Sequence, residues 1–108
     1  MQEATALSAL AALSQQTRLQ LFRRLVTAGE AGLTPGNLIE EFSLAPATLS
    51  FHLKELRQAG LIGQQQQGRS LIYSANYPVM NELINYLTEN CCEGNECEFT
   101  TQNACSVC

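Results

Sequence analysis

The fold of this chain is decided by residues 34–62, which read TPGNLIEEFSLAPATLSFHLKELRQAGLI. Thr34-Pro35 is typical of a helix start, because an N-cap threonine precedes a proline in the first helical turn. Pro46 starts a second helix in the same way, and we expect this helix to run to Gly60. Only residues 43–45 separate the two helices, and a connection this short predicts a helix-turn-helix.

Helical periodicity also dominates the segments before this motif. Residues 3–13 form an Ala/Leu-rich helix, and Ser14 is expected to cap a second helix that ends at Gly29. We expect an apolar stripe of this second helix to face inward, formed by Leu19, Phe22 and Val26. Two further leucines, Leu21 and Leu25, lie beside this stripe.

The pattern changes after Gly60. Residues 61–67 and 70–74 flank Gly68-Arg69, which predicts two strands and a turn. Residues 79–89 predict a last helix with a broad apolar stripe, wide enough to pack on its own domain and on a partner. The predicted fold is therefore mainly α with a small β-hairpin, a winged helix-turn-helix that occupies residues 1–90.

In a winged helix, the second helix of the motif enters the major groove of DNA and the hairpin touches the backbone or the minor groove. Leu49, Leu53 and Leu56 lie on one face of this helix and should anchor it to the core. The opposite face then carries Ala47, Ser50, Phe51 and Lys54, with Thr48 and His52 at its margins. An ordinary amphipathic helix with a solvated face would show the same pattern.

These side chains suit different kinds of DNA contact. Small and hydroxyl-bearing residues permit close approach to base edges, and Phe51 could lie against a thymine methyl group. Lys54, Arg57 and Arg69 are candidates for phosphate contacts, which position a protein on DNA without reading its sequence. His52 is the only histidine in the sequence. A lone histidine is more often a surface or capping residue than a metal ligand, so a metal-binding role for it is the weaker interpretation.

The formal net charge is −4, which argues against nucleic acid as a partner unless the positive charge is localised. Residues 1–90 hold all six basic side chains and seven of the ten acidic ones, so this part is close to neutral. The start of the sequence has no basic region, and no apolar stretch approaches the roughly 20 residues that cross a bilayer. We therefore expect a cytoplasmic protein without a membrane partner.

All five cysteines fall within residues 91–108, which separates a thiol-bearing tail from a cysteine-free body: Cys91, Cys92, Cys97, Cys105 and Cys108. In a reducing compartment, clustered cysteines more often bind metals or carry out redox chemistry than form structural disulfides. Soft thiolates at short spacing select soft or borderline ions.

The chain also resembles the ArsR/SmtB repressors. Residues 11–19 are similar to their "ALxxxTRL" opening, residues 48–62 to their recognition helix and first wing strand, and residues 68–73 to their wing tip. The resemblance implies a homodimeric winged-helix repressor, not an enzyme, whose first and last helices form the dimer interface. Such a repressor binds double-stranded operator DNA, here expected as an inverted repeat, and leaves it when a metal or metalloid binds. No organic cofactor is implied.

The ligand set then follows from the resemblance. Zinc sensors of this family carry Asp/His pairs on the last helix, and many arsenic sensors carry Cys-x-Cys near the recognition helix; this chain has neither. It is similar instead to arsenic sensors whose cysteines follow the last helix. Cys91, Cys92 and Cys97 would then bind trivalent arsenic or antimony, which favours a pyramid of three sulfurs.

Cys105 and Cys108 lie outside the resemblance, and their Cys-x2-Cys spacing would suit zinc, whose structural sites are usually tetrahedral. Three alternatives stay open: a zinc or cadmium sensor, a thiol-redox-sensing repressor that forms a disulfide in the tail, and a structural zinc tail. A thiol oxidoreductase is less well supported, because Cys105 and Cys108 lack the helix N-terminus in a βαβ setting that such enzymes use.

Overall fold

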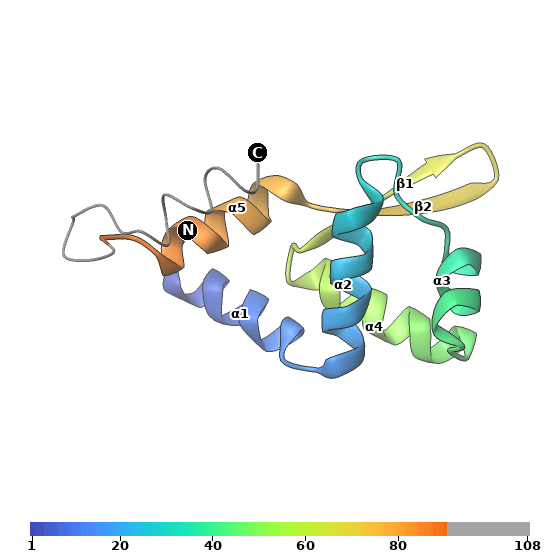
Figure 1. Cartoon of the computed structure of the whole chain (residues 1–108), viewed down its shortest axis with the longest axis horizontal. Coiled ribbons are helices and arrows are strands. Elements are labelled where there is room, and N and C mark those ends of the chain that lie inside the picture. The colour runs from blue at the N-terminus through green and yellow to red at the C-terminus, as the bar shows by residue number, and fades with distance from the viewer. Residues whose placement is uncertain (91–108) are drawn as a thin grey trace.

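The computed structural model describes residues 1–90, and Figure 1 shows how the elements are arranged. Five helices and one antiparallel hairpin follow each other along this part of the chain: α1 (Glu3–Leu13), α2 (Gln16–Ala28), α3 (Pro35–Phe42), α4 (Pro46–Gln58), β1 (Ile62–Gln67), β2 (Ser70–Ala75) and α5 (Tyr77–Leu87). The mainly helical fold with one hairpin is thus confirmed, and α3, α4 and the hairpin form the winged helix-turn-helix.

The start of α3 is fixed by a capping box. The Thr34 hydroxyl accepts a hydrogen bond from the Asn37 backbone N–H at 3.1 Å, and the Asn37 side chain accepts one from the Thr34 N–H at 3.1 Å. Two backbone donors at the helix start are therefore satisfied. At the other end, Ser43 adopts a left-handed conformation with φ of 53°, which ends α3 and turns the chain toward Pro46.

The predicted cap of α2 was wrong. The Gln15 side chain, not Ser14, accepts a hydrogen bond from the Arg18 N–H at 2.8 Å. The Ser14 hydroxyl instead donates to the carbonyl of Ala11 at 2.8 Å, at the end of α1. Serine can serve either terminus, because its hydroxyl both donates and accepts.

The last helix begins earlier than predicted. Asn76 is its N-cap and accepts a hydrogen bond from the Val79 N–H at 3.4 Å, so Pro78 lies inside the first turn. This position suits proline, which has no N–H to lose there. The helix ends at Leu87 rather than at residue 89.

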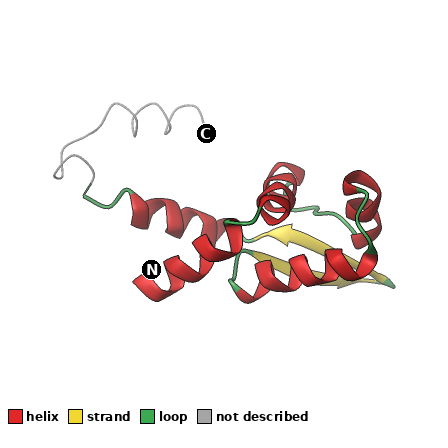
Figure 2. Ribbon diagram, turned by 90° about the horizontal axis from the view of Figure 1, so that it is seen from below, coloured by secondary structure: helices red, strands yellow, loops and turns green. Residues whose placement is uncertain are grey.

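The wing is tied to the loop before α3. β1 and β2 pair from Ile62↔Ala75 to Gln67↔Ser70, and Gly68 turns between them with φ of 62°. Beyond this hairpin, Leu33 forms a bridge with Tyr73 through two backbone hydrogen bonds of 2.9 and 2.8 Å. Figure 2 shows the hairpin extending beside the helices, and this bridge anchors its base.

The core is formed mainly by leucines from α2, α3, α4 and the start of the wing; the fully buried ones are Leu21, Leu25, Leu38, Leu49, Leu56 and Leu61. The prediction that Leu19 faces inward was wrong, because its side chain is 41% exposed. Leu21 and Leu25 face the core instead, and the side chains of both are 0% exposed. Helix α2 packs against α1, α4 and β2, and these contacts determine which of its sides is buried. The two apolar stripes of α2 are adjacent, so periodicity alone does not predict which one faces the core.

Helices α1 and α5 lie side by side, away from the wing (Figures 1 and 2). Ala6, Ala9 and Ala12 turn the small-residue face of α1 toward the domain. Large apolar side chains remain exposed on both helices: Leu7 at 60%, Leu10 at 39%, Ile84 at 50% and Leu87 at 58%. Within residues 1–90, every helix is too short or too polar to span a bilayer.

Candidate nucleic-acid interface

Helix α4 is anchored on one face and open on the other. Leu49, Leu53 and Leu56 are 1%, 3% and 0% exposed, as the leucine spacing predicted. The residues predicted to face DNA are mostly exposed in the structure: Ala47, Thr48, Ser50, Phe51, Lys54 and Arg57. The helix therefore presents a continuous polar surface with one large apolar side chain, Phe51, which is 55% exposed.

His52 does not lie on this open face. Its side chain is only 8% exposed and belongs to the buried surface of α4, so its predicted position at the margin of the DNA-facing surface was wrong. The signal was present in the sequence, because residues 49, 52, 53 and 56 follow the i, i+3, i+4, i+7 spacing of one helix face.

The partner of His52 is Arg18, a residue that the sequence motif contained but for which no role was predicted. Arg18 Nη1 lies 3.3 Å from His52 Nδ1, and Arg18 Nε donates to the carbonyl of Ala12 at 2.8 Å. Burial lowers the pKa of His52 below its ordinary value of 6.5, and the Arg18 cation lowers it further, whereas Glu55 opposes them. His52 is therefore favoured in its neutral form.

The wing contributes Arg69, which is exposed at its tip next to Gly68. Arg57 connects α4 to the wing, because its Nη1 donates to the side-chain oxygen of Gln64 at 2.9 Å. Gln64 lies in the strand predicted at residues 61–67, for which no contact with the recognition helix was predicted. The hydrogen bond holds the Arg57 guanidinium between the recognition helix and the hairpin.

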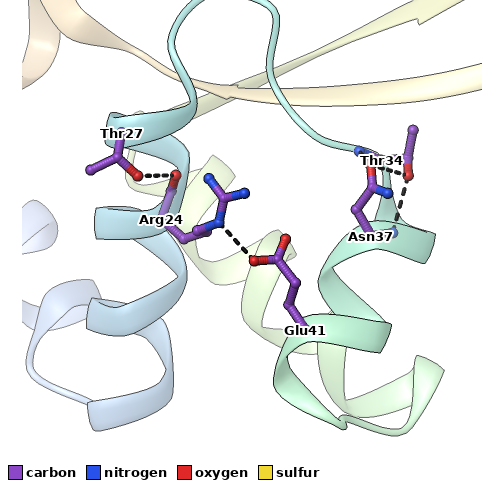
Figure 3. Close-up of polar contacts among 5 residues, drawn as sticks. All are labelled: Arg24, Thr27, Thr34, Asn37 and Glu41. Carbon is purple, nitrogen blue, oxygen red and sulfur yellow. Dashed lines mark hydrogen bonds and ion pairs between the residues drawn. The ribbon is translucent and has the colours of Figure 1, made fainter.

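Three of the six cations, Lys54, Arg57 and Arg69, are exposed on α4 and the wing, where a DNA-binding surface on an acidic chain needs them. Arg24 is used differently: its Nε donates to Glu41 at 2.8 Å and joins α2 to α3 (Figure 3). This pair neutralises one cation on a neighbouring part of the surface.

The five cysteines predicted to bind metal or metalloid lie outside the described residues. Within residues 1–90, no three His, Cys, Asp or Glu side chains are gathered as a metal site would need. The predicted ligands Cys91, Cys92 and Cys97, and the predicted boundary of the tail after residue 90, remain predictions.

Comparison with known proteins identifies the family. A model described as a helix-turn-helix domain matches residues 13–65, which contain α2, α3, α4 and most of β1. The transcriptional repressor SdpR of Bacillus subtilis is 32% identical over 76 residues, which cover 70% of this chain and 81% of SdpR. The chain belongs to the ArsR family of helix-turn-helix transcriptional regulators.

Solved structures agree with the fold of this ArsR-family regulator. An ArsR-like transcriptional regulator from Rhodococcus sp. RHA1 matches with a TM-score of 0.74 at 22% identity, covering 95% of this chain and 93% of that one. HlyU from Vibrio cholerae matches with a TM-score of 0.63 at 28% identity, over 81% of this chain and 97% of that one. Membership of the ArsR family makes the protein a DNA-binding transcriptional regulator rather than an enzyme.

The named relatives differ in the direction of their effect. SdpR is a repressor, whereas HlyU of Vibrio cholerae, 27% identical over 93 residues, is named a transcriptional activator. HlyU covers 86% of this chain, and the matched region is 83% of HlyU. Membership of the ArsR family therefore establishes regulation through DNA, and leaves repression and the inducer as matters for a proposal.

Proposed function

We propose that this ArsR-family regulator is a homodimeric repressor of an inverted-repeat operator, and that trivalent arsenic or antimony releases it by binding Cys91, Cys92 and Cys97. The observation that carries the proposal is positional. Cys91 and Cys92 follow the end of α5 by four and five residues, and Cys97 follows it by ten. Helix α5 lies beside α1, and these two helices carry four of the exposed large apolar side chains.

Dimer formation is supported by the exposed apolar side chains of α1 and α5. Leu7 and Leu10 repeat at i, i+3 on α1, and Ile84 and Leu87 do so on α5. Burying one leucine or isoleucine stabilises an assembly by roughly 1.5–3 kcal/mol, so four such residues from each protomer would contribute substantially. A two-fold dimer would place the two α4 helices about 34–36 Å apart, or a multiple of this distance, to reach successive major grooves.

Sedimentation of the 108-residue chain tests the dimer. Ile84→Glu should shift the mass to that of a monomer at micromolar concentration, because a carboxylate would be buried in the interface. Asn85→Glu places the same charge at an exposed polar position of α5 that points about 100° away from Ile84 round the helix, on the side opposite Leu87, and should leave the dimer intact. A wild-type monomer, or a dimer that tolerates Ile84→Glu, would contradict the assignment.

Operator recognition is supported by the open face of α4 and by the basic wing. Lys54→Ala or Arg69→Ala should weaken binding to every DNA sequence and flatten its salt dependence, since each removes a phosphate contact. Ser50→Ala or Phe51→Ala should instead reduce the difference in binding affinity between operator DNA and random DNA. Fluorescence anisotropy at two salt concentrations separates the two effects, and an unchanged preference in both helix variants would exclude this face.

Metalloid release is supported by the chemistry of the three thiols. Trivalent arsenic keeps a lone pair and favours three sulfur ligands, and ligand binding next to the proposed interface would alter the geometry of the two α4 helices. Bound metalloid would then weaken the affinity for DNA, and bound DNA would weaken the affinity for metalloid by the same factor. A coupling of about 1–3 kcal/mol corresponds to roughly 5–150-fold, enough to induce when the repressor is near its operator Kd.

Cysteine variants test this step under reducing conditions. Replacing Cys91, Cys92 or Cys97 by serine should leave operator binding intact and abolish its release by arsenite. Cys105→Ser and Cys108→Ser serve as matched controls and should still respond. If Cys97→Ser responds like wild type while Cys105→Ser or Cys108→Ser does not, the third ligand is wrongly assigned.

The same tail could serve a zinc or cadmium sensor or a thiol-redox sensor, and its composition favours these as the second candidates. Native mass spectrometry of the reduced protein with arsenite, antimonite, zinc and cadmium distinguishes them. A metalloid sensor should retain one arsenic or antimony per tail, a zinc sensor should retain zinc in preference, and a redox sensor should bind none of them tightly.

A further inference from the structure

We propose that Arg18 is a positioning residue: it holds recognition helix α4 in its operator-binding orientation against α1 by donating to Ala12 and to neutral His52, and protonation of His52 releases α4. We name these two contacts the Arg18 bridge. The inference rests on the proposed operator-binding face of α4 and is independent of the cysteine tail.

The geometry joins three helices at one side chain. Arg18 stands in the first turn of α2, where the Gln15 side chain accepts from its backbone N–H. Its Nε donates at 2.8 Å to the Ala12 carbonyl, one of the last carbonyls of α1, which lack partners within the helix. Its Nη1 reaches 3.3 Å to Nδ1 of His52 in the middle of α4, 34 positions along the chain.

The bridge requires a particular protonation state. An arginine guanidinium only donates hydrogen bonds, so His52 Nδ1 must accept and the ring proton must be on Nε2. An imidazolium ion donates from both nitrogens and offers no acceptor. Protonated His52 would therefore lose the bond to Arg18 and place two cations against each other in a site where the histidine is 8% exposed.

The charged groups around His52 favour the neutral form. Arg18 on α2 disfavours the imidazolium, and Glu55 on α4 favours it, but burial and Arg18 together keep the pKa of His52 below 6.5. Helix α1 contributes no titratable side chain between Ala4 and Leu13, and β1 contributes none at all.

Helix α3, which also packs on α4, carries two carboxylates. Glu40 and Glu41 are both exposed, and Glu41 is paired with Arg24 at 2.8 Å. Neither is among the groups that shift the pKa of His52. The protonation of His52 is thus set by its burial, by Arg18 and by Glu55.

Two contacts couple the protonation state of His52 to the proposed DNA-binding surface. The Phe51 ring packs edge-on against the His52 ring, with centroids 5.5 Å apart and planes at 61°, while Phe51 itself is 55% exposed on the open face. The bridge also fixes α4 to the end of α1, the helix proposed to face the partner protomer. Loss of the bridge would therefore disturb both a base-reading side chain and the spacing of the two α4 helices.

The sign of the pH effect follows from linkage. If operator binding needs neutral His52, then affinity is full above the pKa of His52 and falls as pH drops through it. Reciprocity requires the operator to lower the pKa of His52 further. Folding stability has the same sign, because the unfolded chain with a pKa near 6.5 binds the proton more readily.

NMR of His52 tests the bridge directly, since the untagged 108-residue chain contains one histidine and gives one pair of imidazole nitrogen signals. The ring nitrogens should report the Nε2–H tautomer and a pKa below 6.5, and operator DNA should lower that pKa. Arg18→Gln should raise the pKa toward 6.5, whereas Arg23→Gln, the same charge change at an exposed position of α2, should leave it in place. An Nδ1–H tautomer, or equal effects of the two arginine variants, overturns the proposal.

Operator anisotropy then tests the functional consequence. From about pH 7.5 to about one pH unit below the His52 pKa that the NMR experiment measures, wild-type affinity should fall at least about fivefold more than that of His52→Gln, whose amide can accept from Arg18 but does not titrate. Equal pH dependence in the two proteins overturns the proposal. Absence of operator binding by wild type at the higher pH would instead refute the proposed function, while the NMR experiment would still report on the bridge.

Discussion

Replacing Gly32 by alanine should detach the base of the wing from the loop before α3. Gly32 has φ of +69°, and a Cβ built there would lie 2.3 Å from the carbonyl oxygen of Tyr73 and 2.7 Å from Ile72 Cγ2. The first of these neighbours is backbone, so the clash is relieved only if the loop and β2 separate. Separation would break the two Leu33–Tyr73 backbone hydrogen bonds of 2.9 and 2.8 Å.

The magnitude follows from these two costs. A left-handed conformation costs a residue with a Cβ roughly 1–2 kcal/mol, and each lost hydrogen bond costs about 0.5–1.5 kcal/mol. Gly32→Ala should therefore lower the free energy of unfolding by about 2–5 kcal/mol. The matched control is Gly68→Ala at the wing tip, where φ is +62° and nothing lies within 4 Å, so that only the conformational cost remains.

Urea unfolding at one protein concentration measures both variants, and amide hydrogen exchange at Leu33 and Tyr73 locates the damage. We expect Gly32→Ala to lose clearly more stability than Gly68→Ala and to expose both amides to faster exchange. Equal losses in the two variants, or unchanged exchange at Leu33 and Tyr73, would refute the reasoning.

Three smaller effects can be measured by the same unfolding assay. Tyr77→Phe removes the hydroxyl that donates to the Val26 carbonyl at 2.8 Å and should cost about 1–2 kcal/mol, since that carbonyl is left without the bond; no loss would show that water replaces it. Thr34→Ala removes the cap of α3 and should cost about 0.5–2 kcal/mol, with glycine at the same position milder. Arg24→Ala breaks the exposed pair with Glu41 and should cost no more than about 1 kcal/mol, and less at high salt; a larger, salt-independent loss would contradict this.

Local signals in the sequence determined much of the helix-turn-helix. Thr34 and Pro35 set the start of α3, and Gly68 set the turn of the wing, because caps, prolines and positive φ angles depend on only a few neighbouring residues. The leucine spacing of α4 likewise predicted its buried face correctly. The exposed positions of Ser50 and Phe51 followed from that spacing.

Tertiary packing decided which contacts form between segments that are distant in sequence. The exposure of Leu19 depends on which side of α2 meets its neighbours, which periodicity within α2 does not specify. The Arg18–His52 contact joins residues 34 positions apart, and the approach of Gly32 to Tyr73 joins a loop to a strand. Local sequence sets the conformation of a segment, but the packing of the whole chain sets which side chains meet, since burial is a property of the assembled core.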